Sequence, residues 1–536
     1  MEANEAKKEE QGERKNIRGG VILAYIRFVI LLIVGILYPP YLLEMVQSTN
    51  NGLYQFAGSI IQYTLLLSLG IENSYIRFAT VYEKKDGEEG LRKINGFYLI
   101  CYGFIACLEL VVGLTVAGLY GFGAIANGND PATNQTLGWL FLIISLMSSL
   151  DFFMSLFSTF AFYKSKFIWE QSVYLAIHLI TTGLCALFLY LGKDIITVAI
   201  ITAVVQLLFD GVRFIYDWKH LHMRFTKPTK IEFKSLFKEV VVFTIFLFMA
   251  IVVAQINANL GKTVLGYVGA FTLVTVYSYG LQFYTYENQI STTIGSNFGP
   301  KVNRLAIEGK NEEIAELFIK ISEIQLIILF LMVGGFAACG KDFIFAWLGG
   351  KNNGLSADNL NEIFYLTLAL LALWIIPMAE SLGIEVQKSY NKHKFLAIVN
   401  LVLALLSIGV TGLCVHFMPG DSKVYGPFIG TALVVVVGMI IVSNIYYQKE
   451  FHLPILRFFK HFLIVAALAV VGWAVVYCLY RFGVHLPDSL NKWLVVLIKG
   501  ALFVVIYLPL VFVVYHQQIK SFVKAHKSTK EGEEHA

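Results

Sequence analysis

The sequence predicts an all-α polytopic membrane protein with about 14 transmembrane helices. Of its 536 residues, 57% are hydrophobic and only 15% are charged, and the mean hydropathy is +0.66. A transmembrane helix needs about 20 predominantly apolar residues, and apolar runs of that length recur along the whole chain. Basic residues gather in alternate connecting segments, which is typical of a multi-pass protein. Together these observations exclude a soluble globular fold.

The apolar segments fall into two sets of six, followed by a last pair. The connection from Trp218 to Phe237, which is the most basic of the chain, separates the two sets. The predicted helices span residues 19–46, 52–82, 94–120, 136–162, 167–191, 194–216, 236–258, 262–290, 318–339, 361–386, 393–417, 425–447, 458–481 and 491–515.

The distribution of positive charge predicts the topology. Most of the 42 lysine and arginine residues fall in the terminal segments and in every second connection, and positive charge is retained on the cytoplasmic side of a membrane. We therefore expect an even number of helices with both termini in the cytoplasm. The basic residues that remain for the external segments are few: Lys193, Lys262, Lys341, Lys351, Lys423, Arg481 and Lys492.

The most polar stretch at membrane depth runs from Ala254 to Lys310. We expect one helix to end at the amides Gln255, Asn257 and Asn259, and a second helix to start after a tight turn. That second helix carries Gln282, Tyr286, Glu287 and Asn288 among others. Polar groups are costly in hydrocarbon unless they face protein or a water-filled cavity. The pattern therefore predicts a cavity wall, and a polar seam that only joins helices is the alternative.

Ionisable residues also lie inside the predicted spans. Arg27 lies about two turns inside helix 19–46, and Glu109, Asp151 and Glu380 lie within three other predicted helices. Such residues are rare in membranes and mark substrate or ion pathways. We expect the sequence Pro39-Pro40 to break the first helix. Asp210 and Arg213 lie three residues apart, and this spacing predicts a local ion pair.

A weak internal repeat relates the two sets of helices. Tyr54 and Tyr63 precede the sequence EKKDGEEG, and Tyr277 and Tyr286, with the same spacing, precede EGKNEEIA. Transporters are commonly built from paired halves with the substrate site between them. The repeat therefore predicts two pseudo-symmetric six-helix lobes around a central cleft, with two C-terminal helices packed outside.

Several functional classes find no support in the sequence. The six cysteines lie in apolar runs without a CxxC pair, so no disulfide frame, zinc site or other metal site is predicted. The glycine-rich sequence GFGAIANG at residues 121–128 follows a membrane helix, and no Walker loop is present. The longest external loop, from Lys341 to Asn361, is short and has no acidic pair. We therefore expect no enzyme, no cofactor and no nucleic-acid partner.

Four segments of the chain carry a family resemblance: GLYQFAGSIIQYTLLLSLGIENSYIRFAT, QINANLGKTVLGYVGAFTLVTVYSYGLQ with FGPKVNRL, QKSYNKHKF, and YGPFIGTALVVVVGMIIVSNIYYQKE. They resemble the polysaccharide transporter (PST) family of the multidrug/oligosaccharidyl-lipid/polysaccharide (MOP) exporter superfamily. The resemblance covers most of residues 19–450. Relatives often carry an aspartate near Asn257 or Asn259, where this chain has amides, so no cation site is carried over to that position.

The resemblance implies a flippase like those that export O-antigen. Such a protein translocates an oligosaccharide linked to undecaprenyl pyrophosphate across a bacterial cytoplasmic (inner) membrane by alternating access, for cell-surface polysaccharide such as lipopolysaccharide or capsule. Its partners are that substrate and membrane lipids, with a polymerase and glycosyltransferases as further candidates, and it is expected to be a monomer. A cation-coupled multidrug exporter of the same superfamily and a non-transporting scaffold are the alternatives.

The predicted organisation and site follow from these arguments. A pyrophosphate needs cationic and amide donors, and arginine suits it by its planar fork. The cavity candidates are Arg27, Arg77, Gln255, Asn257, Asn259, Gln282, Tyr286 and Asn288; the coupling-ion candidates are Glu109, Asp151 and Glu380. The segments are a leader at 1–18, lobes at 19–225 and 226–450, two helices within 451–515, and a cytoplasmic tail at 516–536.

Overall fold

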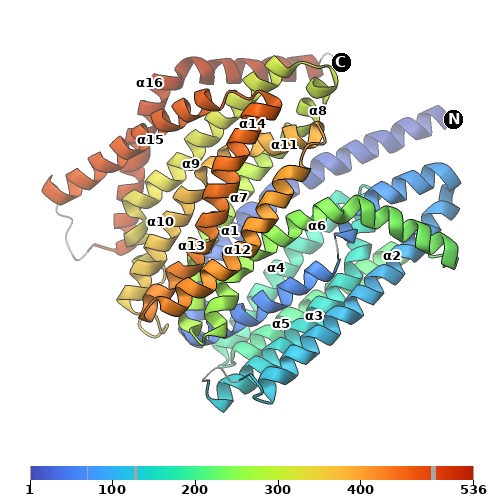
Figure 1. Ribbon diagram of the computed structural model, residues 1–536, viewed down its shortest axis with the longest axis horizontal. Helices are drawn as coiled ribbons and strands as arrows, with labels where there is room; N and C mark the ends of the chain where they lie inside the picture. The colour runs from blue at the N-terminus through green and yellow to red at the C-terminus, as the bar shows by residue number, and fades with distance from the viewer. Residues whose placement is uncertain (1, 69, 126–128, 484–489, 535–536) are drawn as a thin grey trace. The chain divides into compact units, whose positions relative to one another are not determined.

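The computed structural model describes residues 2–68, 70–125, 129–483 and 490–534, and its described residues contain helices and no strand (Figure 1). The first half of the chain forms α1 (Glu2–Gln62), α2 (Tyr75–Gly121), α3 (Pro131–Tyr163), α4 (Phe167–Tyr190), α5 (Ile195–Lys219), α6 (Lys230–Tyr267) and α7 (Phe271–Asn297), with 3-10 segments at Tyr63–Ser68 and Ile71–Ser74. The predicted leader is continuous with α1, and residues 126–128 of the glycine-rich sequence and 535–536 of the tail lie outside the described residues.

The rest of the chain is equally helical. It forms α8 (Gly299–Ile307), α9 (Asn311–Trp347), α10 (Ala357–Ala379), α11 (Ser381–Ser389), α12 (Lys394–Phe417), α13 (Tyr425–Leu433), α14 (Ser443–Phe451), α15 (Ile455–Cys478) and α16 (Lys492–Glu534). A 3-10 segment at Gly420–Val424 and π-helical segments at Val434–Val442 and Leu479–Gly483 interrupt them.

Within the described residues, 12 helices are long and apolar enough to cross a membrane, so the protein is a multi-pass membrane protein. The difference from the fourteen predicted segments arises at two places. The span Gly19–Ser68 contains a kink at Gln47 and therefore includes all of predicted helix 19–46 and part of helix 52–82. Helix α7 corresponds to predicted helix 262–290 but is not among the twelve.

The chain divides into two compact units. The first unit comprises Met1–Ser278, Gly350–Leu355 and Ala404–Gly430, and the second comprises Tyr279–Gly349, Ser356–Leu403 and Thr431–Ala536. Helices α1 to α6 therefore lie in the first unit, and α8 to α11 and α14 to α16 lie in the second. The lobe boundaries at residues 225 and 450 stay a prediction.

The expected break of α1 at Pro39-Pro40 is wrong, because the helix continues through both prolines and kinks at Gln47 (φ 66°, ψ 160°). Proline inside a membrane helix is tolerated where neighbouring groups satisfy the backbone. At the kink the released groups of Ser48 find partners in the first unit. Its N–H donates to the carbonyl of Asn353 at 2.8 Å, and its hydroxyl donates to the carbonyl of Gly354 at 2.8 Å.

The expected turn after the amides is also wrong. Helix α6 continues past Gln255 and Asn259 to Tyr267, and the chain turns at Gly269, whose φ of 75° suits a residue without a Cβ. The amide of Asn259 donates to Gln255 Oε1 at 2.8 Å, one helical turn away. The two side chains therefore satisfy each other along the helix and leave its backbone bonds intact.

Predicted helix 361–386 is broken in the structure. Helix α10 ends at Ala379 and α11 begins at Ser381, so Glu380 lies at the junction. Pro377, inside the last turn of α10, lacks an N–H and its ring crowds the preceding turn. The break places a carboxylate where two helix ends meet, as in the discontinuous helices of transporters.

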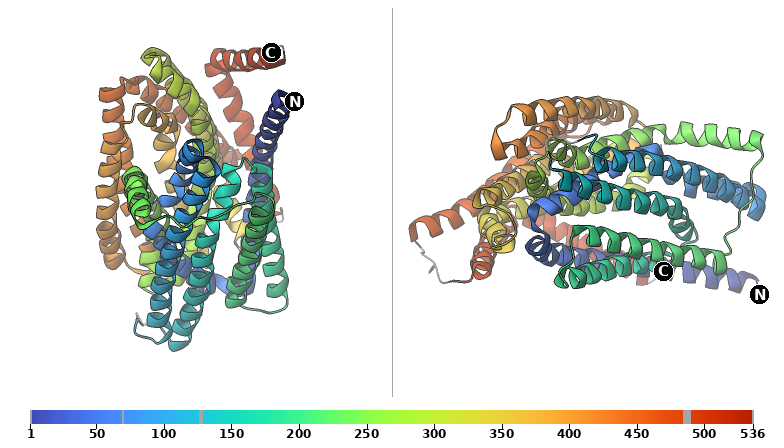
Figure 2. Two further views of the ribbon diagram at one scale, coloured as in Figure 1. Left: turned by 90° about the vertical axis from the view of Figure 1, so that its right-hand side faces the viewer. Right: turned by 90° about the horizontal axis from the view of Figure 1, so that it is seen from below.

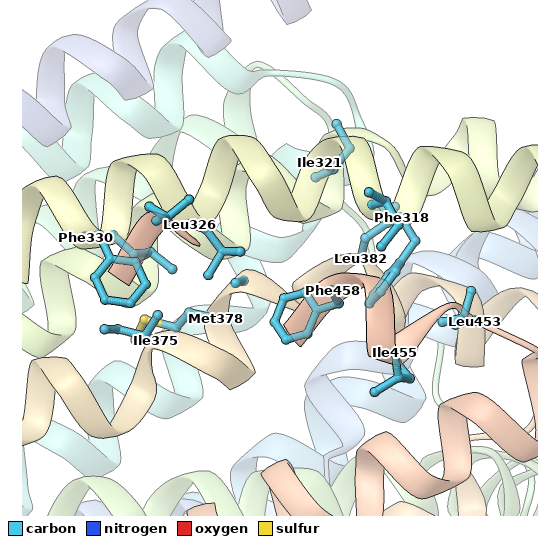
Figure 3. Close-up of a cluster of buried hydrophobic side chains, with 14 of the residues drawn as sticks. Phe318, Ile321, Leu326, Phe330, Ile375, Met378, Leu382, Leu453, Ile455 and Phe458 are labelled. Carbon is cyan, nitrogen blue, oxygen red and sulfur yellow. The ribbon is translucent and has the colours of Figure 1, made fainter. Parts of the chain in front are cut away.

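In the second unit, α15 and α16 pack on α9 (Figures 1 and 2). The buried side chains along these elements form one apolar cluster with α10 and α11, part of which is drawn in Figure 3. It includes Phe318, Leu326 and Phe330 from α9, Met378 from α10 and Phe458 from α15. Lys499 of α16 also pairs with Asp342 of α9 at 2.5 Å.

Helices α2 and α3 lie side by side in the first unit and approach closely at small residues. A Cβ added to Gly113 would lie 2.2 Å from Cβ of Ser145, and one added to Gly138 would lie 2.7 Å from Cα of Gly121. Ser149 donates to the carbonyl of Ala106 at 2.7 Å across the same interface. Small side chains therefore set the spacing of the two helices.

We expect Gly113→Leu to destabilise the protein, because a side chain at this position must push α3 away. Overpacking of this kind typically costs about 1–3 kcal/mol. Thermal unfolding of the purified protein in detergent measures the loss. Gly183→Leu is the matched control, because an added Cβ there meets no described atom within 4 Å. Equal melting temperatures for the two variants would contradict the assignment.

Candidate functional site: a buried charged network

Polar residues follow one face of α5 in the first unit. Gln206, Asp210, Arg213 and Asp217 are spaced by four, three and four residues, which places them on one side of a helix. Asp210, Arg213 and Asp217 are buried, and Gln206 is half-buried. This face therefore brings charge into the interior of the unit.

Arg213 forms the centre of the network. Its Nη1 contacts Oδ1 of Asp210 at 2.9 Å, which confirms the predicted ion pair, and its Nε lies 3.3 Å from Oε2 of Glu170 on α4. Ser158 of α3 donates to the same oxygen of Glu170 at 2.9 Å. The side chains of Arg213 and Glu170 are 4% and 0% exposed. One guanidinium thus compensates two buried carboxylates from two helices.

Asp151, a predicted coupling-ion candidate, joins this network through an amide. Gln206 Nε2 donates to Oδ1 of Asp151 at 2.6 Å and lies 3.3 Å from Oδ1 of Asp210. Asp217 is fully buried, and neither of its carboxylate oxygens has a partner among the described residues. The network therefore holds more acidic groups than Arg213 alone can compensate.

Arg27 of α1 lies beside the network without an ion-pair partner among the described residues. Its guanidinium lies over the ring of Tyr174, 5.2 Å from the centroid, and the guanidinium of Arg213 lies 4.5 Å from the same centroid. The Nε of Arg27 is buried and unpartnered within the described part of the chain. A half-buried arginine is therefore held mainly by an aromatic ring.

Two further predicted residues have local partners. Arg77 is exposed, and its guanidinium lies over the ring of Phe243, 4.3 Å from the centroid. Glu109 is fully buried, and its Oε1 accepts hydrogen bonds from Thr64 at 2.7 Å and Ser148 at 2.5 Å. These contacts give Glu109 a role in joining α2 to α3 and to the segment after α1.

The predicted amides and tyrosine are divided between the units. Gln255, Asn257 and Asn259 lie on α6 in the first unit, whereas Gln282, Tyr286 and Asn288 lie on the part of α7 in the second. Gln282 Nε2 donates to the hydroxyl of Tyr286 at 2.9 Å, which is again a contact within one helix. The structure therefore brings together Gln255 with Asn259, and Gln282 with Tyr286.

The second unit contains two buried carboxylates with unpartnered oxygens. Glu380, the third coupling-ion candidate, is 2% exposed; its Oε2 accepts from Asn444 at 3.2 Å, and its Oε1 has no partner among the described atoms. Glu287 of α7 is fully buried, and both of its carboxylate oxygens lack a described partner. A buried carboxylate without donors is costly and is a place where a proton or cation can bind.

The sequence-based site omitted Tyr174, Asp217 and Glu287. Asp217 extends the stripe of Asp210 and Arg213 by one further turn, so the helical spacing was a usable signal. Tyr174 lies four residues after Glu170 and therefore on its face of α4. Among the described residues, no group of three histidine, cysteine or acidic side chains is suited to hold a metal ion.

The helices and buried polar groups of the described residues define an all-α, multi-pass membrane protein. No protein-family model and no curated protein matches the sequence. The chain is similar to the lipid II flippase MurJ in its inward closed conformation, with a TM-score of 0.65 and 16% identity, covering 93% of this chain and 99% of the flippase.

It is also similar to an inward-facing multidrug resistance MATE family transporter of the MOP superfamily, with a TM-score of 0.55 and 12% identity over 80% of this chain and 99% of that one. The Vibrio cholerae MATE transporter VcmN in the bent form gives a TM-score of 0.50 and 13% identity over 84% of this chain and 99% of that one. The protein therefore has the fold of the MOP superfamily.

Proposed function

We propose that this protein is a flippase that moves a lipid-linked oligosaccharide, carried on a polyprenyl pyrophosphate, from the cytoplasmic to the outer face of a bacterial cytoplasmic membrane. It does so by alternating access, for the synthesis of a cell-surface polysaccharide. The proposal includes cytoplasmic termini, a monomeric protein, and a polymerase and glycosyltransferases as partners in the same process.

Arg27 is the observation that carries this proposal. An arginine within a membrane span is costly unless it is compensated, yet Arg27 has no ion-pair partner among the described residues and contacts the ring of Tyr174. The nearby carboxylates are engaged instead by Arg213 and Gln206. The guanidinium of Arg27 therefore keeps donors that suit two oxygens of a phosphate group.

The similarity to the lipid II flippase MurJ supports a flippase rather than another transporter of this fold. The match to MurJ covers 93% of this chain. The part of the chain beyond Phe451, which contains α15 and α16, is longer than the uncovered remainder, so the match includes some of it. The matches to the MATE structures cover 80% and 84%. The long match is consistent with a flippase architecture, and it identifies the fold rather than the cargo.

We expect Arg27→Ala to abolish flipping while the protein remains folded in the membrane, because the headgroup loses its charged ligand. Arg27→Lys is expected to restore only part of the activity, since an ammonium lacks the bidentate geometry. The measurement is the fraction of lipid-linked sugar that becomes accessible to an external glycosidase in vesicles containing the purified protein.

Arg92→Ala is the matched control, because its side chain is 48% exposed and its pair with Glu88 lies at the surface of α2. Normal flipping by Arg27→Ala at normal protein levels would assign Arg27 a structural role and remove the main support for this substrate. If the Arg92 variant also lost flipping, the effect of Arg27→Ala would not be specific to Arg27 and would not support the proposal.

A cation-coupled exporter is the second candidate, and the unpartnered oxygens of Glu287 and Glu380 favour it. Such a protein exchanges an amphiphilic substrate for protons or sodium ions that bind a buried carboxylate. A drug-efflux assay in cells that lack other exporters separates the two candidates: only the exporter should lower drug accumulation, and only if both carboxylates are intact.

A further inference from the structure

A cavity of about 430 Å³ lies in the second unit, and none of its lining residues belongs to the charged network described above. Three elements line it: the short helix α8, the first half of α9 and the start of α15. Its lining residues are Lys301, Leu305, Glu313, Glu316, Leu317, Ile319, Lys320, Glu323, Arg457 and His461. The cavity therefore brings together cations from segments that are far apart in the sequence.

Two of these cations make no direct ion pair within the described residues, although the carboxylate of Glu323 lies close enough to Arg457 to attract it. Lys301 of α8 and Arg457 of α15 form no ion pair with any described residue. Two acids of the lining have closer partners: Glu323 contacts Nε2 of His461 at 3.0 Å, and Glu313 lies 3.5 Å from Lys310. Glu316 is exposed. Lys301 and Arg457 therefore keep donors that are not used in a direct ion pair and can bind an anion.

The wall of the cavity at α15 is fixed by a second contact. Nδ1 of His461 lies 3.1 Å from the hydroxyl of Tyr515 on α16, so both ring nitrogens of the histidine are occupied. Tyr515 has a non-helical backbone conformation (φ −112°, ψ 16°), and α16 kinks there. The imidazole therefore joins α9, α15 and α16 beside the cavity and is not itself free to bind a ligand.

The cavity also offers apolar surface. Leu305, Leu317 and Ile319 line it and are 3%, 8% and 2% exposed. Ile307, at the end of α8, is 81% exposed, which is typical of a short helix that lies at a membrane surface. Helix α8 begins at Gly299, two residues after α7 ends at Asn297. The combination of unpaired cations with an apolar floor suits an amphiphile at the membrane interface.

We propose that this cavity binds the phosphate group of an anionic membrane lipid, with Lys301 and Arg457 as its ligands. The two side chains lie on α8 and α15, so the bound headgroup joins the C-terminal helices to the segment after α7. A ligand that binds only the folded state stabilises it by an amount that grows with the logarithm of its concentration above Kd. This inference is independent of the transported substrate, and its test requires no transport.

The test is a thermal unfolding titration of the full-length protein in an uncharged detergent. Dioctanoyl phosphatidylglycerol is expected to raise the melting temperature with the logarithm of its concentration, by about 2–4 °C at roughly 100 times its Kd. Dioctanoyl phosphatidylcholine and inorganic phosphate, tested at the same concentrations, are expected to have no such effect. The rise is expected to disappear in the double variant Lys301→Gln/Arg457→Gln.

The matched control is Arg304→Gln/Lys460→Gln, which removes the same charge from the same two helices at residues that do not line the cavity. It should keep the full rise in melting temperature. Loss of the rise in both double variants would overturn the proposal. An equal rise with phosphatidylcholine or inorganic phosphate would overturn it as well. Native mass spectrometry of retained lipid provides a second measurement that does not depend on unfolding.

Discussion

Replacing Arg213 by methionine is expected to destabilise the protein more than any other single change described above. The variant would leave Glu170 and Asp210 buried without the guanidinium that lies 3.3 and 2.9 Å from them. Removing one partner of a buried ion pair typically costs about 3–5 kcal/mol, because the remaining charge is uncompensated. Thermal unfolding in detergent and the amount of folded protein in membranes measure the effect.

The variant Glu170→Gln/Asp210→Asn/Arg213→Met tests the cause. Buried ion pairs can often be replaced as a whole with little loss of stability, so this variant is expected to recover most of the melting temperature. Arg92→Met provides the surface control, and exposed pairs are worth only about 0–1 kcal/mol. If Arg213→Met unfolds at the wild-type temperature, the network does not stabilise the first unit.

Flipping is expected to follow the membrane potential. A pyrophosphate-linked substrate carries roughly two negative charges outward across an inside-negative membrane, and each charge is worth about 2.3 kcal/mol per 100 mV. Two charges therefore contribute roughly 4–5 kcal/mol, close to the ~5.5 kcal/mol that shifts a two-state equilibrium from one side to the other. The potential alone is sufficient to bias the cycle outward.

In reconstituted vesicles, transport should cease when valinomycin and potassium remove the potential. It should persist when the sodium and proton gradients are removed at constant potential. Glu380→Gln and Glu287→Gln remove the buried carboxylates of the second unit, and Asp151→Asn removes one from the first; all three should flip at near wild-type rates. Transport that instead follows an ion gradient, and is uncoupled by one of these changes, identifies an antiporter.

Composition and hydrophobic pattern were sufficient to predict an all-α membrane fold and nearly every helix. The predicted helix boundaries were wrong where contacts between residues distant in the sequence determine the backbone conformation. The kink of α1 lies at Gln47 because the carbonyls of Asn353 and Gly354 accept from Ser48. No local pattern records those partners, whereas Pro39-Pro40 is a strong local signal that the membrane environment overrides.

The candidate site was also predictable only in part, because its contacts join residues that are distant in the sequence. The presence of Arg27 and Asp151 inside apolar helices marked them as exceptions. Their partners, Tyr174 for Arg27 and Gln206 for Asp151, depend on the packing of four helices whose mutual rotation the sequence does not define. Glu287 was visible as an acid on a polar helix, but its lack of a described partner is a property of the fold.

The packing of α15 and α16 on α9 has a consequence for how the protein is assembled during synthesis. These helices are made last, and α9 is then already in the bilayer. Lipid tails cover the apolar surface of α9 about as well as two further helices do, so apolar contact alone gives them little reason to dock. Lys499 with Asp342, and His461 with Glu323, are different, because separating them leaves charged and polar groups without their partners. Polar recognition thus sets the position at which the last hairpin joins the protein.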